Sequence, residues 1–411
     1  MDAPMIFYDR KRTRPGTRLF HRLRSRRAAG LHTACEKVLH MKFKRTLKLL
    51  ASGILGCALL FALPAAAEEE TCTSVLTGET VPVSIGRKRP IALMFNNIYG
   101  SLPQCGISSS GVLVEAEVEG LITRIMGIME DYQDCERIGS VRSARNYYYY
   151  FAREFQSIYC HYGEAAYALP LLYLDSTIEL NGLSDIGDTV YFRSDDREAP
   201  HNAFTNYARI QEGISKTGID ANLPDAYQNH FRFAPADQPT MNENGVTANV
   251  VLPGYVENHA RFEYHPEDGL YYRSEYGDIQ VDGNTGAQLS CKNIILQYCD
   301  SQPFDENGYL WTDVINGGSG KYITNGKAID ITWRKPFAQG ETTYIVNIDT
   351  PNVSVPVYTG DFEVTSYYDM NGNEILLNPG QTWICLIRNS AASKVLITDD
   401  YSVPSDMTDG Y

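Results

Sequence analysis

The stretch IGSVRSARNYYYY, from Ile138 to Tyr150, places two arginines three residues apart ahead of four consecutive tyrosines. Apolar side chains then recur at the spacing i, i+3, i+4 and i+7, which is the pattern of one buried helical face. These side chains are Tyr148, Phe151, Ala152 and Phe155. The stretch therefore predicts a short strand followed by a helix whose tyrosines lie at least partly in the core.

The two arginines fall where the predicted strand ends and the helix begins. Ser143 is a suitable N-cap residue, which would place Arg142 at the end of the strand and Arg145 in the first helical turn. Exposed backbone N–H groups and the helix dipole favour an anion at this position. Because an arginine has the wrong charge for a first turn, we expect Arg145 to have an anionic partner.

A second strand is predicted over 157–162, directly after the helix. If it runs parallel to the strand that ends at Arg142, both carboxyl ends lie at the same edge of the sheet. His161 would then lie beside Arg142, at the kind of edge where open α/β sheets bind ligands. We therefore predict an anion-binding site that combines Arg142, Arg145 and His161.

The polar segment YFRSDDREAPHNAFTN repeats this arrangement further along the chain. A strand ends at Arg193, a charged loop follows, and Thr205 is the expected cap of the next helix. The loop carries Arg197, His201 and Asn202, and we expect it to close over the first cluster. A histidine next to an asparagine in a loop favours a functional role for His201.

Other interpretations of these residues stay open. Arginines at strand ends often pair with nearby acids, here Glu119 or Asp195, and would then have a structural role. Metal binding by His161, His201 and a carboxylate is a minor alternative. No GxSxG, HExxH or P-loop motif is present, and we predict neither a metal nor a cofactor.

Three further segments complete the predicted first domain. RPIALMFNN (89–97) predicts a buried strand, whereas GVLVEAEV (111–118) and ITRIMGIME (122–130) predict the two strands of a hairpin. Glu115 and Glu117 share one face of this hairpin. We interpret them as a solvated face and not as an acid/base pair.

The second half of the chain has a different pattern. After the Pro-, Asn- and Gly-rich segment 234–245, short apolar runs alternate with turn dipeptides such as Asp282-Gly283. The pattern predicts a mostly antiparallel β domain over 246–395. It follows a mixed α/β domain over 88–235 that contains the strand-helix-strand unit, so the predicted fold class is α+β.

The N-terminal region has the features of a secretory signal. Residues 41–67 combine a basic start, an apolar stretch and small residues ahead of an acidic run. Residues 1–40 are then an over-extended gene start, and the alternative is a cytoplasmic tail before a retained anchor. Cleavage after Ala67 is favoured over lipidation at Cys57, which lies early in the apolar run. We therefore expect an extracytoplasmic protein, secreted or anchored to the outer face of a bacterial membrane only through this segment.

Charge and cysteine content limit the class of partner. Residues 68–411 hold 22 Lys and Arg against 47 Asp and Glu, a formal charge of −25. Phosphate backbones and anionic lipid surfaces repel so acidic a protein, and we therefore do not expect nucleic acid as a partner. The seven cysteines after Ala67 show no CxxC motif or clustered spacing, so neither a disulfide framework nor a zinc site is predicted.

Several segments together resemble the YerB family of bacterial envelope lipoproteins, over about residues 88–388. Besides IGSVRSAR, they are RPIALMFNN, PQCG, EVEGLITR, HYG, DREAPHN, YYRSEYGDIQVDGNTGAQLSCKNII, GGSGKYITNGKAIDITW and GQTWI. The resemblance implies a secreted or membrane-tethered protein of two parts, whose activity is not established. Ser140 stands where the family usually has proline, and the second glycine or alanine that the family usually has around HYG is missing, so the loop after His161 is expected to differ.

The resemblance also implies a set of polar positions: Glu119, Thr123, Arg124, Arg142, Arg145, His161, Arg197, His201, Asn202, Asp282, Asn293 and Trp333. From these and the residue patterns, the predicted ligand-binding residues are Arg142, Arg145, His161, Arg197, His201, Asn202, Glu119 and Arg124. The catalytic residues, if any exist, are not predicted.

The function expected from these observations is binding of an anionic envelope component, or of an envelope protein, at the arginine and histidine edge. Two alternatives from other classes stay open. The first is a phosphoryl or glycopolymer transferase similar to the LytR-CpsA-Psr enzymes, which use arginines to hold a lipid pyrophosphate. The second is an envelope scaffold that binds a protein through an exposed aromatic patch. Whether the protein is an enzyme is left open.

Overall fold

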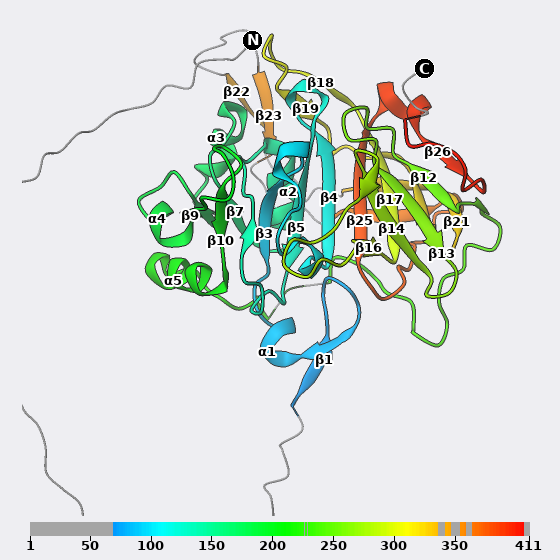
Figure 1. The fold of residues 1–411 in the computed structure, drawn as a ribbon, viewed down its shortest axis with the longest axis horizontal. Coiled ribbons are helices and arrows are strands. Elements are labelled where there is room, and N and C mark those ends of the chain that lie inside the picture. The colour runs from blue at the N-terminus through cyan, green and yellow to red at the C-terminus, as the bar shows by residue number, and fades with distance from the viewer. Residues whose placement is uncertain are drawn as a thin grey trace, which may run out of the picture. The chain divides into compact units, whose positions relative to one another are not determined.

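Strand β4 (Val112–Glu117) joins the two halves of the largest sheet in this computed structural model (Figure 1). The structure describes residues 69–406 except 226, 228, 336–341, 347–353 and 359–363, and for 342–346 and 354–358 it describes the backbone. The predicted signal peptide and the extension before it lie outside the described residues.

The main sheet contains eleven strands. On one side of β4 lie strands from the first half of the chain, in the order β5 (Thr123–Met129), β3 (Ile91–Asn96), β7 (Ile158–His161) and β8 (Glu179–Asn181). On the other side lie β25 (Thr382–Arg388), β17 (Asn293–Cys299), β20 (Gly318–Thr324), β21 (Lys327–Arg334) and β11 (Val246–Thr247), with β24 (Ser366–Asp369) also paired to β21. Both regions of the chain therefore contribute to one sheet, in which β25 runs parallel to β4 and to β17. The domain boundary near 234–245 stays a sequence prediction.

The remaining strands form smaller sheets. One has six strands, β12 (Val250–Leu252), β13 (Arg261–His265), β14 (Leu270–Glu275), β15 (Asp278–Ile279), β16 (Ser290–Cys291) and β26 (Leu396–Thr398). Another has three, β6 (Ile138–Gly139), β10 (Ala203–Thr205) and β9 (Phe192–Arg193). Three pairs complete the set: β1 (Thr71–Thr73) with β2 (Thr80–Pro82), β18 (Ser301–Pro303) with β19 (Leu310–Thr312), and β22 (Thr342–Val346) with β23 (Ser354–Tyr358).

The helices are short. They are α1 (Val83–Gly86), α2 (Asn146–Glu154), α3 (Leu169–Leu172), α4 (Gly187–Val190) and α5 (Tyr207–Thr217). Single turns of 3-10 helix occur at η1 (Tyr99–Ser101), η2 (Ile107–Ser109), η3 (Glu119–Leu121) and η4 (Ala166–Ala168), and a longer one at η5 (Asn389–Lys394). The fold is thus mixed α and β with mostly antiparallel sheets, as the α+β prediction requires at this level.

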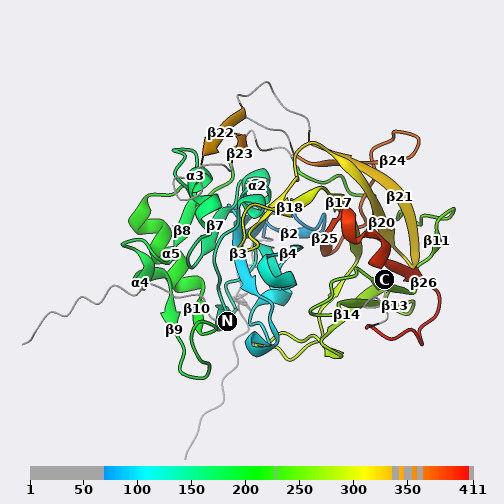
Figure 2. The ribbon, with the colours of Figure 1, turned by 90° about the horizontal axis from the view of Figure 1, so that it is seen from above.

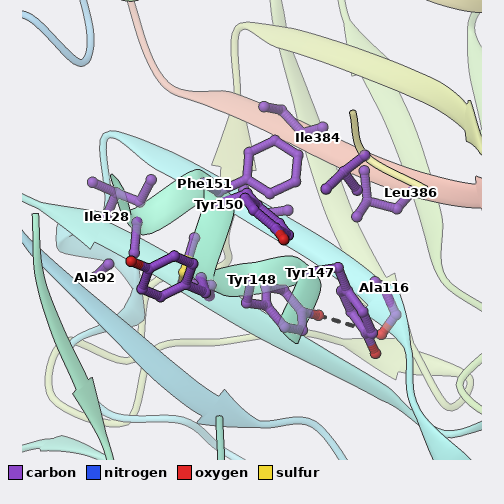
Figure 3. Packing of buried hydrophobic residues seen from close by; sticks show 14 of the residues in the cluster. Ala92, Ala116, Ile128, Tyr147, Tyr148, Tyr150, Phe151, Ile384 and Leu386 are labelled. Atoms are coloured by element: carbon purple, nitrogen blue, oxygen red, sulfur yellow. Dashed lines mark hydrogen bonds between the residues drawn. The ribbon is translucent and has the colours of Figure 1, made fainter. Parts of the chain in front are cut away.

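Helix α2 and the six-stranded sheet lie on opposite faces of the main sheet (Figure 2). The tyrosines of α2 pack over β3, β4 and β5, and Figure 3 shows Tyr148 and Phe151 among the other buried side chains of this cluster. Tyr147 and Tyr148 donate hydrogen bonds to backbone carbonyls of Glu117 (2.7 Å) and Arg124 (2.6 Å). Burying one such side chain fully, relative to leaving it exposed, stabilises the fold by about 1.5–3 kcal/mol. All four tyrosines are buried, more completely than the helical spacing predicts.

The strand predictions over 89–97, 111–118 and 122–130 are confirmed. β3 lies within the predicted 89–97, and β4 and β5 form the predicted antiparallel hairpin, connected by η3. The prediction of helices in this region is also confirmed, but the predicted caps are wrong. The N-cap of α2 is Arg145, in extended conformation and without a side-chain cap bond, so the helix begins three residues after Ser143. The N-cap of α5 is Asn206, whose side chain accepts a hydrogen bond from the Arg209 N–H, and not Thr205.

The strand-helix-strand unit differs from the prediction. The strand before α2 ends at Gly139 and pairs antiparallel with β10, outside the main sheet. Residues 142–144 nevertheless run alongside the segment after β7, because Tyr162 N–H donates to the Arg142 carbonyl (3.1 Å) and Ala144 N–H to the Gly163 carbonyl (2.9 Å). The backbone of Arg142 therefore reaches the predicted edge without belonging to a strand there.

The interpretation of Glu115 and Glu117 as a solvated face is wrong. Glu115 is 0% exposed and Glu117 is 6% exposed. Side chains of the six-stranded sheet lie over Glu115: Arg273 of β14 donates two hydrogen bonds to its carboxylate (2.9 and 2.8 Å) and also lies 3.0 Å from Glu275. The Trp383 indole N–H donates to Glu115 as well (3.1 Å). A buried ionic network thus joins the two sheets. Its charges can be buried because each of them has a partner of opposite charge.

Candidate anion-binding site

The backbone fixes Arg142 between two strand ends. Its N–H donates to the Met94 carbonyl in β3 (2.8 Å), and its carbonyl accepts from Tyr162, directly after β7. The residue is half-buried, so its side chain remains accessible from solvent. The sequence predicts Arg142 at this edge for a different reason, namely a parallel strand ending at Arg142, whereas the strand before α2 ends at Gly139.

Arg145, three residues later, is bound to Glu119. Its Nε donates to Glu119 Oε2 (3.0 Å), and its second terminal nitrogen donates to Oε1. The remaining nitrogen donates to the carbonyls of Ser143 (3.4 Å) and Ala144 (2.9 Å). Every guanidinium nitrogen of Arg145 therefore has an acceptor within the protein. The structural interpretation, an arginine paired with Glu119, holds for this residue.

Arg124 of β5 shares the same carboxylate less closely. One terminal nitrogen lies 3.8 Å from Glu119 and the other donates to the Ser143 carbonyl (2.7 Å), whereas its Nε is buried without a hydrogen-bond acceptor. Burial, followed by repulsion from Arg145, lowers the pKa of Arg124 to about 9 although Glu119 opposes the shift. The side chain is 3% exposed, so solvent does not compensate its charge, and Glu119 compensates it only in part.

Glu119 lies in η3, at the turn between β4 and β5. Burial opposes its ionisation, but the guanidinium groups of Arg145 and Arg124 outweigh that effect and hold the pKa of Glu119 below its usual range. The carboxylate is therefore ionised at neutral pH and neutralises one of the neighbouring positive charges.

Arg142 has no carboxylate within 4.0 Å in the part of the chain that the structure describes. One terminal nitrogen donates to the Pro200 carbonyl (3.2 Å), and Nε has no acceptor. Burial and then repulsion from Arg145 lower the pKa of Arg142, with Arg193 adding to the shift and Glu119 opposing it. Among the described residues, the three guanidinium groups thus have Glu119 as their neighbouring carboxylate, and it is bonded to Arg145 and not to Arg142.

Strand β9 and the loop after it bring Arg193 and His201 into the neighbourhood of Arg142. His201 Nδ1 accepts a hydrogen bond from the Asn96 side chain (2.7 Å), which leaves the proton of the neutral ring on Nε2. Burial, then Arg142 and Arg197, lower the pKa of His201. Arg193 is exposed, and its guanidinium lies 4.6 Å from the ring centre of Tyr162.

The other two predicted loop residues hold the loop in place. Arg197 donates to the carbonyls of Ser101 and Pro103, the latter at 2.6 Å, which ties the loop to the turn after β3. Asn202 Oδ1 accepts from Arg193 (2.8 Å), and its amide donates to the Ser194 carbonyl (3.2 Å). The loop therefore lies against the arginine cluster, held by side-chain to backbone hydrogen bonds.

His161 lies in β7 with both ring nitrogens engaged within the fold. Nε2 is 2.9 Å from Glu179 and Nδ1 is 2.8 Å from the Gly163 carbonyl. The side chain is fully buried. The structure therefore brings the backbone after His161 to Arg142 but directs the imidazole to another partner.

Sequence reasoning omitted two residues that the structure places in the cluster. Arg193 appears in the sequence as a strand-end arginine, which was a usable signal, but it was not included among the site residues. Asn96 ends β3 and orients His201, a relationship that no local pattern indicates.

Three polar positions implied by the family resemblance have structural partners elsewhere. Asp282 accepts hydrogen bonds from the backbone and hydroxyl of Ser108 (both 2.9 Å). Asn293 accepts from the Tyr322 hydroxyl (2.9 Å), and the Trp333 indole donates to a backbone carbonyl (3.0 Å). None of these contacts involves the arginine cluster.

Among the described residues, a cavity beneath the end of α2 lies away from the arginine cluster. It has a volume of about 140 Å³ and is lined by Tyr149, Arg153 and Ser157 among others, and not by the cluster arginines. In the described part of the chain no group of three or more His, Cys, Asp or Glu side chains is arranged to hold a metal ion. None of the helices described has the length and apolarity needed to cross a bilayer.

Family, sequence and structure comparisons with known proteins agree on one family. Residues 76–220 match the N-terminal domain, and residues 250–356 the C-terminal domain, of a protein of unknown function (DUF3048). The chain is 28% identical over 295 residues to the Bacillus subtilis (strain 168) protein named “Putative lipoprotein YerB”, covering 68% of this chain and 88% of that protein. It also matches the crystal structure of the YerB protein from Bacillus subtilis with a TM-score of 0.62 and 25% identity, covering 80% of this chain and all of that one.

The two domain matches together cover most of the described chain, and the YerB resemblance recognised in the sequence is confirmed. The chain belongs to the DUF3048 family, with an N-terminal and a C-terminal domain of that family and with YerB as a relative.

Proposed function

We propose that this protein is an envelope protein located outside the cytoplasm, which binds an anionic ligand at a site centred on Arg142. The lipoprotein name of its relative YerB supports the location. The sequence pattern of residues 41–67 supports it as well.

The observation that supports anion binding most strongly is the excess of positive over negative charge in the cluster. Among the described residues, Glu119 lies within 4.0 Å of Arg124 and Arg145, whereas Arg142 has no carboxylate within that distance. Burial and mutual repulsion lower the pKa of Arg124 and of Arg142. Buried guanidinium groups are costly unless they are paired. A bound anion would supply the missing negative charge and the missing acceptors at both Nε atoms.

The surrounding elements favour access for such a ligand. Arg142 is half-buried and Arg193 is exposed, so the positive groups can be reached from solvent. The N-terminus of α2 follows directly, and its first turn has no side-chain cap. Exposed N–H groups in a first helical turn add to the attraction of guanidinium groups for an anion.

A thermal-shift titration of the full chain with inorganic phosphate and pyrophosphate tests the proposal. A ligand at 100 times its Kd stabilises the native state by about 2.7 kcal/mol, which raises the melting temperature by a few degrees. We expect Arg142→Ala to lose this response. Arg232→Ala is the matched control, because it removes an equal charge from an exposed ion pair with Glu374 and should respond as the wild type does.

The opposite result would favour a different class of function. If neither anion shifts the melting temperature of the wild type, the arginines act only within the fold. The scaffold that binds an envelope protein would then be the better account.

A further inference from the structure

We infer that the ligand of this site carries a phosphoryl dianion and not a single carboxylate, and that Glu119 sets this preference. The inference rests on the proposed function and concerns the same site. It follows from the way in which Glu119 already occupies part of the cluster.

Glu119 is in effect a carboxylate ligand attached to the protein. It accepts hydrogen bonds from two nitrogens of Arg145 and lies 3.8 Å from Arg124. The other nitrogen of Arg145 is used by backbone carbonyls. A guanidinium group matches a carboxylate through two parallel hydrogen bonds, and Arg145 already has this arrangement.

A free carboxylate ligand would gain little binding free energy at this cluster. To reach Arg145 it must displace an identical group that is held in place by the chain and therefore has a high effective concentration. At Arg142 it would meet the negative field of Glu119, which reaches that arginine and partly opposes the lowering of its pKa by burial and by Arg145. Glu119 thus discriminates against carboxylate ligands by competing with them for Arg145.

A phosphoryl dianion is suited to the charge that remains. Three guanidinium groups less one carboxylate leave a formal surplus of two positive charges in the Arg124, Arg142 and Arg145 cluster. The Nε atoms of Arg124 and Arg142 lack acceptors. A phosphoryl group has three strong acceptor oxygens and a charge near −2, so it can serve two arginines without displacing Glu119.

Calorimetric titration at pH 8 with inorganic phosphate and with acetate tests this inference on the full chain. For the wild type we expect phosphate to bind at least tenfold more tightly than acetate, with both affinities reduced in Arg142→Ala. In Glu119→Gln we expect the acetate affinity to rise at least tenfold, which narrows the preference for phosphate.

Three results would overturn the inference in distinguishable ways. If the wild type binds acetate as tightly as phosphate and Arg142→Ala loses both, the proposed function stands and the ligand class is wrong. If Glu119→Gln weakens both anions, Glu119 only positions Arg145. If no anion binds to either protein, the proposed function itself fails.

A second variant covers the case in which Glu119→Gln does not fold. Glu119→Asp keeps the charge on a shorter side chain, which loosens the double hydrogen bond to Arg145. Acetate is expected to bind it several-fold more tightly than the wild type, and an acetate affinity equal to or below the wild-type value would contradict the role of Glu119.

Discussion

Glu119 binds Arg145 through two hydrogen bonds, whereas Arg142 lies three residues earlier in the same segment without a carboxylate within 4.0 Å among the described residues. The two arginines are therefore not equivalent, although the sequence presents them as a pair. Arg145 is 4% exposed and has a structural role. Arg142 is half-buried, and the positive charge around it is not balanced by a carboxylate bonded to it.

This difference predicts unequal effects of two alanine substitutions on the free energy of unfolding. Arg145→Ala leaves Glu119 without its main partner and should cost about 2–4 kcal/mol of unfolding free energy. Arg142→Ala removes a guanidinium that repels Arg145 and should stay within about 1 kcal/mol of the wild type. Urea denaturation of both variants measures this. An equal loss of stability in the two would show that Arg142 is also structural.

Anion binding should depend on pH through His201. Burial and the neighbouring arginines lower the pKa of His201 in the free protein, so the ring is neutral at pH 7. A bound anion favours the charged ring, so protons are taken up on binding and the affinity should increase as the pH falls below about 6.5. Sulfate is the appropriate probe, because it remains a dianion from pH 5 to pH 8.

The matched variant for this experiment is His201→Asn, which keeps a polar side chain beside Asn96 and does not titrate. Sulfate affinity in the wild type is expected to be several-fold higher at pH 5 than at pH 8, and nearly constant in the variant. A wild-type affinity that does not change with pH, or a variant that keeps the full change, would remove His201 from the site.

A buried ion pair at the other end of α2 predicts a specific loss of stability in acid. Burial opposes ionisation of Glu154, but Lys335 and the hydrogen bond from His230 hold its pKa at about 2. The lowered pKa means that this contribution is fully present above about pH 4.5 and is lost as the pH falls towards 2. Glu154→Gln should cost about 3–5 kcal/mol at neutral pH, because Lys335 loses this carboxylate.

Unfolding free energies measured between pH 2 and pH 7 check the prediction for Glu154. The wild type and Glu154→Gln should converge towards the acid end, because the wild-type carboxylate becomes protonated there. A constant difference across the range would mean that the Glu154 charge does not contribute to stability.

Gly163 is predicted to be essential for the segment that carries the arginines. Its φ is +88°, and a Cβ atom would lie 2.9 Å from the Ser143 hydroxyl. Gly163→Ala should therefore cost about 1–3 kcal/mol and weaken anion binding, because the Gly163 carbonyl also holds Ala144. Gly218→Ala is the control, since its φ is +73° with open space around it, and it should show the conformational cost alone.

The local elements around the site could be predicted because short-range patterns determine them. Alternation and turn residues predict the β4–β5 hairpin, and helical spacing predicts α2. The same patterns do not determine which strands are neighbours. β25, from the end of the chain, lies between β4 and β17, and Glu115 is buried because Arg273 of a later strand lies over it.

The candidate site was predictable in composition but not in pairing. Arg142, Arg145, Arg197 and His201 do gather from separate segments, as the strand-end arginines and the polar loop suggest. Glu119 binds Arg145 and not Arg142 because of the position of η3 relative to the start of α2. That position is a tertiary relationship, and the N-cap of α2 at Arg145 in place of Ser143 follows from it only once the structure is known.

The most direct test of the account is the location of a bound anion in crystals of the full chain grown or soaked with selenate, found from the anomalous scattering of selenium. The account predicts a selenium peak beside Arg142, with selenate oxygens about 2.7–2.9 Å from its guanidinium nitrogens and with Glu119 still on Arg145. Selenate bound only elsewhere on the protein, with nothing beside Arg142, would contradict it.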